Sequence, residues 1–187
     1  TALIRNSYKN CEPSILSIGK KSSEYFSKNG YNVVGTYDNL YNEITFDAVS
    51  KIAENIMNDF TERKIDKVFL VYNQFKNAAT QIIVNENYLP VDFRENKTGK
   101  IDDYIFEPSK NKIIKELIPK SLKNQLYKAI LDSHAAEHGA RMTAMHKATD
   151  NASELKDDLK LHYNKARQAA ITSEILEIVG GAEAINN

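Results

Sequence analysis

The sequence contains a single cysteine, Cys11, among 187 residues. One cysteine cannot form an internal disulfide or supply a cysteine-based zinc site, and it favours a reducing compartment. No apolar run approaches the roughly 20 residues that a membrane-spanning helix needs. No signal-peptide pattern is visible at the start, and residues 1–10 read as the middle of a structure, so we expect sequence to precede Thr1.

The sequence also lacks an excess of either charge. It has 25 basic and 25 acidic residues, divided as 16 of each sign in residues 1–119 and nine of each in residues 120–187. A protein that binds nucleic acid needs a basic face to neutralise phosphates, so nucleic acid is not an expected partner. With 42% hydrophobic and 27% charged residues, the composition is typical of a soluble globular protein.

The glycine motifs that hold phosphates are missing. There is no G-x-G-x-x-G, and Ile18, Gly19 and Lys20 lack the first glycine and the spacing of a P-loop. A glycine that ends a strand is the simpler interpretation of Gly19. The sequence therefore predicts no bound cofactor.

Residues 1–118 alternate between strand and helix patterns, which predicts a small Rossmann-like α/β sheet with flanking helices. The strongest strand, 67–72 (KVFLVY), is expected to be covered on both faces, and 92–103 is expected to be a loop. The other predicted strands are 14–19, 32–35, 80–85 and 104–106, and the predicted helices are 20–29, closed by Gly30, and 46–64.

Residues 119–187 form the second predicted domain, a single long helix. Strong helix formers fill this part, Pro119 is suited to a helix start, and Gly180 and Gly181 are suited to a helix end. A helix over 120–179 is about 90 Å long at 1.5 Å per residue. A compact body of this chain length is only about 40 Å across, so the helix is expected to protrude.

A stripe of apolar residues runs along this helix and indicates a missing partner. Its steps average 3.5 residues, the period of a left-handed coiled coil. We define the stripe as Met142, Met145, Ala148, Ala152, Leu155, Leu159, Tyr163, Ala166 and Ala170. Either the chain forms a dimeric coiled-coil scaffold, or the partner helix lies in a segment before Thr1.

The end of the helix favours insertion into another protein. An apolar tip cluster is interleaved with threonine, serine and glutamate, a mixture that suits a surrounding protein sleeve better than the fraying end of a dimer. We define the tip cluster as Ile171, Ile175, Leu176, Ile178 and Val179.

One enzymatic alternative arises from His134, Glu137 and His138. They match H-x-x-E-H, a zinc-hydrolase pattern, with both histidines on one helical face. No third ligand is evident in the sequence, so two histidines on a polar helix are the simpler interpretation.

Taken together, the motifs of the long helix resemble the gamma subunit of F-type ATP synthases. The segments GARMTAM (139–145), ATDNA (148–152), YNKARQAAIT (163–172) and EILEIV (174–179) match almost every position of that family's C-terminal pattern. Weaker similarity, at 18–21, 64–73 and 104–108, extends the resemblance over the chain. The family's N-terminal helix and first strand would precede Thr1, and that helix would be the partner of the stripe.

The resemblance implies a rotor shaft without an active site. The subunit would turn inside the hexamer of alpha and beta subunits, couple proton-driven rotation to ATP synthesis, and contact the epsilon subunit and the c-ring. It would be peripheral to the cytoplasmic face of a bacterial plasma membrane. Carried over by motif or as neighbours, the expected subunit contacts are Arg141, Lys165, Arg167, Gln168, Thr172, Glu174 and Glu177.

Overall fold

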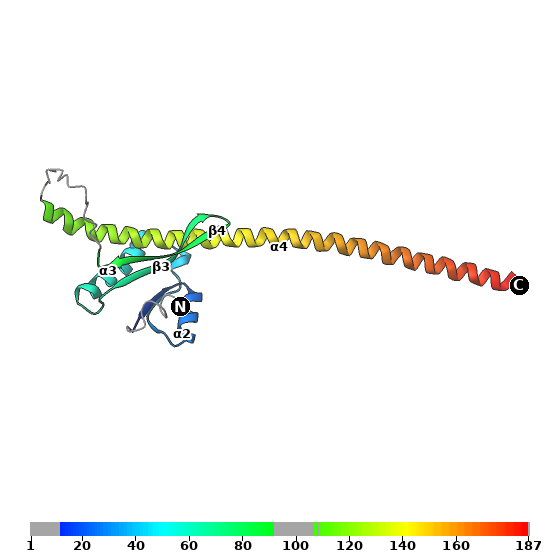
Figure 1. The fold of residues 1–187 in the computed structure, drawn as a ribbon, viewed down its shortest axis with the longest axis horizontal. Coiled ribbons are helices and arrows are strands. Elements are labelled where there is room, and N and C mark those ends of the chain that lie inside the picture. Colours follow the sequence, from blue (N-terminus) through cyan, green and yellow to red (C-terminus); the bar gives the residue numbers. More distant parts are fainter. Residues whose placement is uncertain (1–11, 92–106, 108, 187) are drawn as a thin grey trace. The chain divides into compact units, whose positions relative to one another are not determined.

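The computed structural model describes residues 12–91, 107 and 109–186. The chain divides into two compact units, Thr1–Glu137 and His138–Asn187, which we call unit 1 and unit 2. Figure 1 shows the elements. They are β1 Ser14–Ile18, α2 Lys20–Lys28, β2 Asn32–Tyr37, the short 3-10 turn η1 Leu40–Asn42, α3 Phe46–Thr61, β3 Val68–Asn77, β4 Thr80–Leu89 and α4 Lys110–Asn186.

Residues 14–37 of unit 1 form a strand–helix–strand unit. β1 and β2 pair in parallel, from Ser14 opposite Asn32 to Ile18 opposite Tyr37. Gly19 joins β1 to α2 with φ of 99°, a conformation that side chains disfavour. A Cβ at this position would lie 3.0 Å from the Tyr41 ring. The positive φ therefore favours glycine, and a larger residue would also require the Tyr41 ring to shift.

β3 and β4 form a separate antiparallel hairpin. The described strands thus make two two-stranded sheets, where the sequence predicts one. The expectation that 67–72 is covered on both faces is wrong, because Val71 in β3 is 58% exposed. β-Branched and aromatic residues favour a strand in either setting, so the composition of this segment does not show whether one face or both faces are buried. The predicted loop 92–103 and strand 104–106 lie outside the described residues.

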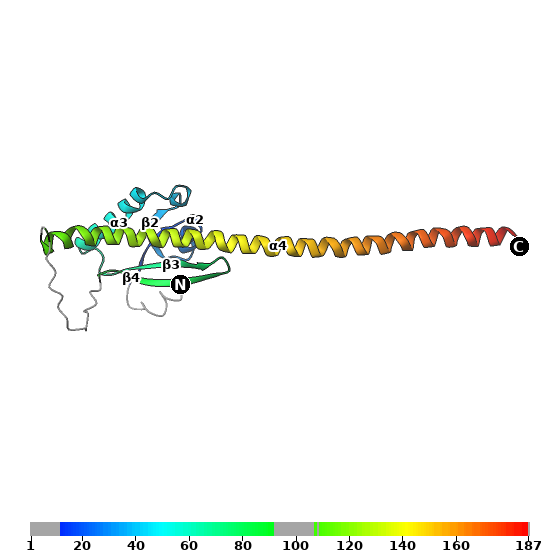
Figure 2. The same cartoon turned by 90° about the horizontal axis from the view of Figure 1, so that it is seen from above.

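The core of unit 1 joins α3, the end of β4 and the first part of α4. Thr45 caps α3, since its Oγ1 accepts from the backbone N–H of Ala48 at 3.4 Å. In Figure 2 this part of α4 runs between α3 and the β3–β4 hairpin. The buried core side chains are Val49, Ile52, Ala53 and Ile56 from α3, Tyr88 and Leu89 from β4, and Leu122, Leu126 and Ile130 from α4.

α4 is longer at both ends than the sequence predicts. It begins at Lys110, includes Pro119, and continues through Gly180 and Gly181 to Asn186. Proline removes one helical hydrogen bond, and each glycine costs about 1 kcal/mol relative to alanine. Burial of the turns just after Pro119 offsets the first cost. The small sheets with helices and the long C-terminal helix confirm the predicted fold class. The predicted domain boundary between residues 118 and 119 stays a prediction.

Candidate functional site

The candidate functional site is the surface of α4 within unit 2. Every residue from 144 to 182 is exposed, and this unit's 49 helical residues extend about 70 Å at 1.5 Å per residue. No helix among the described residues has the length and apolar content needed to cross a bilayer. Within this unit the described side chains bury almost nothing, and strong helix formers favour the helical conformation locally.

Every residue of the apolar stripe is exposed on this helix. The exposed fraction reaches 63% for Met145, 58% for Leu159 and 66% for Tyr163. Exposed apolar residues that recur on one helical face are typical of a surface that another protein covers.

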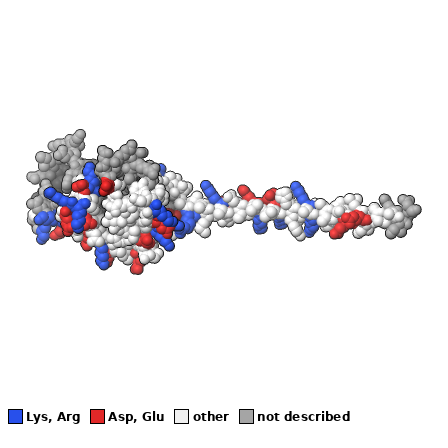
Figure 3. All heavy atoms as spheres, turned by 90° about the horizontal axis from the view of Figure 1, so that it is seen from below, with Lys and Arg blue, Asp and Glu red and all other residues white. Residues whose placement is uncertain are grey.

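The tip cluster is displayed in the same way, with Ile178 72% exposed and Leu176 66% exposed. Glu174 and Glu177 lie among these apolar side chains, and Figure 3 shows acidic side chains towards this end of the helix. An apolar surface with acidic neighbours can bind a protein wall that supplies both apolar and basic groups.

The predicted contact residues near the tip occupy two faces. At about 100° per residue, Lys165, Gln168 and Thr172 share one face of α4. The Thr172 hydroxyl donates to the Gln168 backbone carbonyl at 2.9 Å, which fixes the orientation of the threonine.

Arg167, Glu174 and Glu177 lie on the other face by the same helical geometry. Arg141 is separated from Lys165 by about 36 Å along the axis, so the structure does not bring it together with the rest. All seven predicted residues are exposed.

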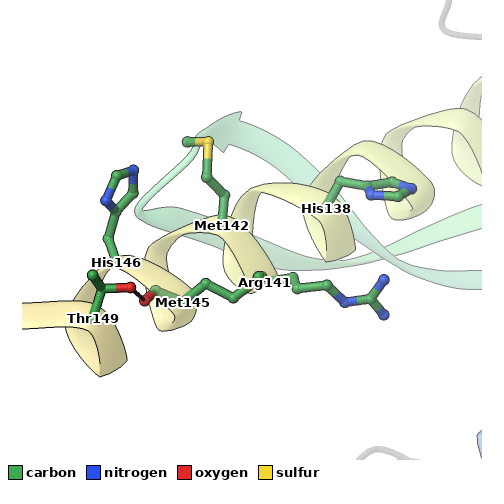
Figure 4. A pocket seen from close by; sticks show the side chains of 6 residues that line it. All are labelled: His138, Arg141, Met142, Met145, His146 and Thr149. Atoms are coloured by element: carbon green, nitrogen blue, oxygen red, sulfur yellow. Dashed lines mark hydrogen bonds between the residues drawn. The ribbon is translucent and has the colours of Figure 1, made fainter. Parts of the chain in front are cut away.

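A shallow groove surrounds Arg141. Figure 4 shows His138, Met142 and His146 in one row along the helix, and Arg141, Met145 and Thr149 in the neighbouring row. The Thr149 hydroxyl donates to the Met145 carbonyl at 3.0 Å. His138 and His146 are not among the predicted contact residues. Each lies four residues from Met142, and this spacing puts all three side chains on the same face of the helix.

The predicted zinc pattern is not supported. Within unit 1 the His134 ring stacks on Tyr41, with centroids 5.6 Å apart and planes 16° apart. Within the described residues no three histidine, cysteine, aspartate or glutamate side chains are grouped so that they could hold a metal ion. Stacking on an aromatic ring gives His134 a packing role.

Polar contacts in unit 1 also connect β4 with β3 and with the first part of α4. Glu86 on β4 accepts from Gln125 at 2.8 Å and from the Tyr72 hydroxyl at 3.2 Å. Burial, followed by the charge of Glu86, raises the pKa of Tyr72. These contacts fix β4 against the first part of α4.

An α/β unit and a helix with an exposed apolar stripe are features typical of a subunit of a larger assembly. A sequence profile described as ATP synthase matches residues 1–185, and the chain belongs to this family. It is 57% identical to an ATP synthase gamma chain of Christiangramia forsetii, over 97% of this chain and 63% of the relative. It is 56% identical to the gamma chain of Flavobacterium johnsoniae, over 96% and 63%.

Solved structures support the fold. A chain of the Euglena gracilis mitochondrial ATP synthase (OSCP/F1/c-ring, rotational state 3) matches with a TM-score of 0.64 and 20% identity. The match covers 98% of this chain and 65% of the other. The chain described above thus spans less than two thirds of the length of these relatives.

Proposed function

We propose that this chain is part of the central-stalk rotor subunit of an F-type ATP synthase. In this role α4 turns inside the hexamer of alpha and beta subunits, and rotation driven by protons is coupled to ATP synthesis there. The subunit itself is not catalytic. The observation that carries the proposal is the fully exposed helix of unit 2, with its apolar stripe and mixed apolar and acidic tip.

The partners follow from this role. Unit 2 contacts the alpha and beta subunits, while unit 1 contacts the epsilon subunit and the c-ring. The membrane association is peripheral, through the complex, on the cytoplasmic face of a bacterial plasma membrane. The names of the relatives, which are bacterial gamma chains, support this assignment.

The seven contact residues supply polar, solvent-exposed groups for the hexamer. Exposed polar and ionic contacts are worth about 0–1 kcal/mol each, so they can break and re-form as the shaft turns. Gln168 and Thr172 are the best pair to test because they share a face and are joined by the hydroxyl-to-carbonyl bond.

The test uses the full-length subunit reconstituted with alpha and beta subunits. We expect ATP-driven rotation of a bead attached to unit 1, and about a 30-fold weaker assembly for the Gln168→Ala, Thr172→Ala double variant, from two hydrogen bonds of about 1 kcal/mol each. Thr143→Ala is the matched control, because the Thr143 hydroxyl makes the same kind of contact with the Gly139 backbone carbonyl and Thr143 is not among the predicted contact residues. Alpha and beta subunits that assemble and rotate no bead would refute the rotor role. Unchanged assembly of the double variant would refute the contact assignment alone.

A further inference from the structure

A cavity in unit 1 has no part in the proposed rotor role. It has a volume of about 360 Å³ and lies between the end of β4 and the first part of α4. The α4 side chains that line it, among them Ile118, Leu122 and Gln125, recur every three or four residues and share one face of the helix. Small-molecule sites have volumes of about 300–1,000 Å³, so a ligand that fits here is small.

The two walls of the cavity run in opposite directions. Glu86 of β4 contacts Gln125 of α4. Two residues further along β4, the Tyr88 hydroxyl contacts the carbonyl of Leu122, which precedes Gln125 in α4. Each end of the cavity is therefore lined by a particular pair of residues, one from each wall.

Glu86 gives one end of the cavity a negative charge in a defined orientation. Its Oε1 accepts from Gln125 at 2.8 Å, and its Oε2 accepts from the Tyr72 hydroxyl at 3.2 Å. Both donors are neutral, so neither balances the charge. A carboxylate has about four acceptor sites, and these donors use two. Glu86 is also the only charged residue among the described residues that line the cavity, so this end favours a cation that donates hydrogen bonds.

The middle and the opposite end of the cavity are apolar. Tyr88 and Leu122 are buried and form the middle of the walls. Val91 of β4 and Ile118 of α4 line the end away from the carboxylate. Ile118 is seven residues before Gln125, which is about 10 Å along the helix. The cavity thus has a charged end and an apolar end separated by about this distance.

We propose that this cavity binds a small primary amine, in its ammonium form, with an unbranched apolar chain of about six carbons. The ammonium group donates to the Glu86 carboxylate, and the chain lies along Leu122 towards Ile118. The nitrogen and the last carbon of n-hexylamine are about 7.5 Å apart, from bond lengths of about 1.5 Å and angles of about 111°. With the radii of its two end groups, this molecule spans the length of the cavity.

The charge of the cavity disfavours other classes of small ligand. A carboxylic acid would bring a second negative charge next to Glu86. A neutral alcohol would make a weaker hydrogen bond with Glu86 than an ammonium group does. A diamine would place its second ammonium group beside Val91 and Ile118, where it loses hydration without a partner. The cavity therefore selects a monoamine.

This inference goes beyond the proposed function. The cavity lies within unit 1, whereas the proposed rotor role rests on the exposed α4 surface of unit 2. Amine binding is measured on the 187-residue chain without alpha and beta subunits, so failure of one proposal leaves the other unaffected.

Nuclear magnetic resonance titrations of the ¹⁵N-labelled chain at pH 7 test the class of ligand. The probes are n-hexylamine, 1-hexanol, hexanoate and 1,6-diaminohexane. We expect n-hexylamine to shift the side-chain amide signals of Gln125 and the backbone amide signal of Tyr88. Its dissociation constant should be about 0.1–1 mM, within the limits for seven non-hydrogen atoms. The other three probes should bind at least about 10-fold more weakly. Equal binding of the amine and the alcohol, or shifts confined to unit 2, would overturn the proposal.

A lysine side chain carries the same ammonium group on four carbons, so Nα-acetyl-lysine amide distinguishes a free amine from a lysine of another protein. Each buried methylene contributes about fourfold to binding. With two fewer carbons, the lysine derivative should bind about 10-fold more weakly than n-hexylamine. Equal or tighter binding of the lysine derivative would exclude a free amine as the intended ligand.

Glu86→Gln tests the charged end. Glutamine keeps the shape of the side chain and an acceptor for Gln125, but it removes the charge. We expect n-hexylamine to bind about 10- to 100-fold more weakly, the usual effect of losing a hydrogen bond to a charged group. Glu62→Gln is the matched control, because Glu62 is exposed, pairs with Lys64 and does not line the cavity. Equal affinities of the two variants would contradict the role of Glu86.

Val91→Glu tests the apolar end by a gain of binding, which an unfolded variant cannot produce. It adds a second carboxylate where the chain of the ligand is expected to end. We expect 1,6-diaminohexane to bind about 10-fold more tightly than it binds the original chain, and n-hexylamine to lose affinity. Val71→Glu is the matched control, an exposed valine of β3 that does not line the cavity. If Val91→Glu left the preference between the two amines unchanged, the proposed position of the chain would be wrong.

Discussion

Tyr88 provides the sharpest prediction about the stability of unit 1. Its side chain is 1% exposed, and its hydroxyl donates to the Leu122 carbonyl of α4 at 3.1 Å. Tyr88→Phe removes this hydrogen bond between β4 and α4 and leaves the ring in place. At pH 7 we expect the free energy of unfolding to fall by about 1 kcal/mol, the usual net value of one hydrogen bond.

The same residue predicts a reversal at high pH. Burial raises the pKa of Tyr88 to about 12, from the usual value of 10.0 for a tyrosine. The neutral hydroxyl is therefore favoured in the folded state, so this contribution is complete below about pH 10 and is lost as the pH rises towards 12. Two pKa units correspond to about 2–3 kcal/mol. Phenylalanine has no proton to lose, so the Tyr88→Phe protein should be the more stable of the two near pH 12.

The assay is urea unfolding at several pH values, followed by near-ultraviolet circular dichroism, which reports the packing of the tyrosines. Other tyrosines and lysines also titrate in this range, but they contribute equally to both proteins and cancel in the difference. Tyr163→Phe, at a 66% exposed position, is the control for the loss of a phenol hydroxyl outside the core of unit 1. A constant difference between Tyr88→Phe and the original protein from pH 7 to pH 12 would refute the argument.

Three further predictions concern packing and the backbone. Leu126→Ala, at a position 3% exposed, should lower the free energy of unfolding of unit 1 by about 2–5 kcal/mol, whereas Leu161→Ala should change it by less than about 0.5 kcal/mol; urea titration distinguishes them. Gly19→Ala should destabilise unit 1 because of its positive φ and the Tyr41 contact. Gly180→Ala, where an added Cβ meets nothing within 4 Å, should slow amide hydrogen exchange of the surrounding helix about fivefold. Faster exchange there would contradict the helical conformation of that glycine.

Local patterns in the sequence determined the order of the elements. The run before Gly19, the amphipathic stripe of α3 and the β-branched run of β3 each express a backbone preference within a few residues. The helix formers after Pro119 likewise predicted the long helix. Its motifs predicted the family, and the comparisons confirmed it. The seven contact residues follow from those motifs and stay a proposal.

Tertiary structure decided which surfaces meet. Strand pairing depends on residues far apart in the chain, so the separate β3–β4 hairpin could not be read from either strand alone. The helix start at Lys110 also depends on packing, because burial of Leu122, Leu126 and Ile130 against α3 and β4 offsets the cost of Pro119. A local sequence records a periodicity, but only contacts between distant segments determine which turns of a helix are buried and which remain exposed.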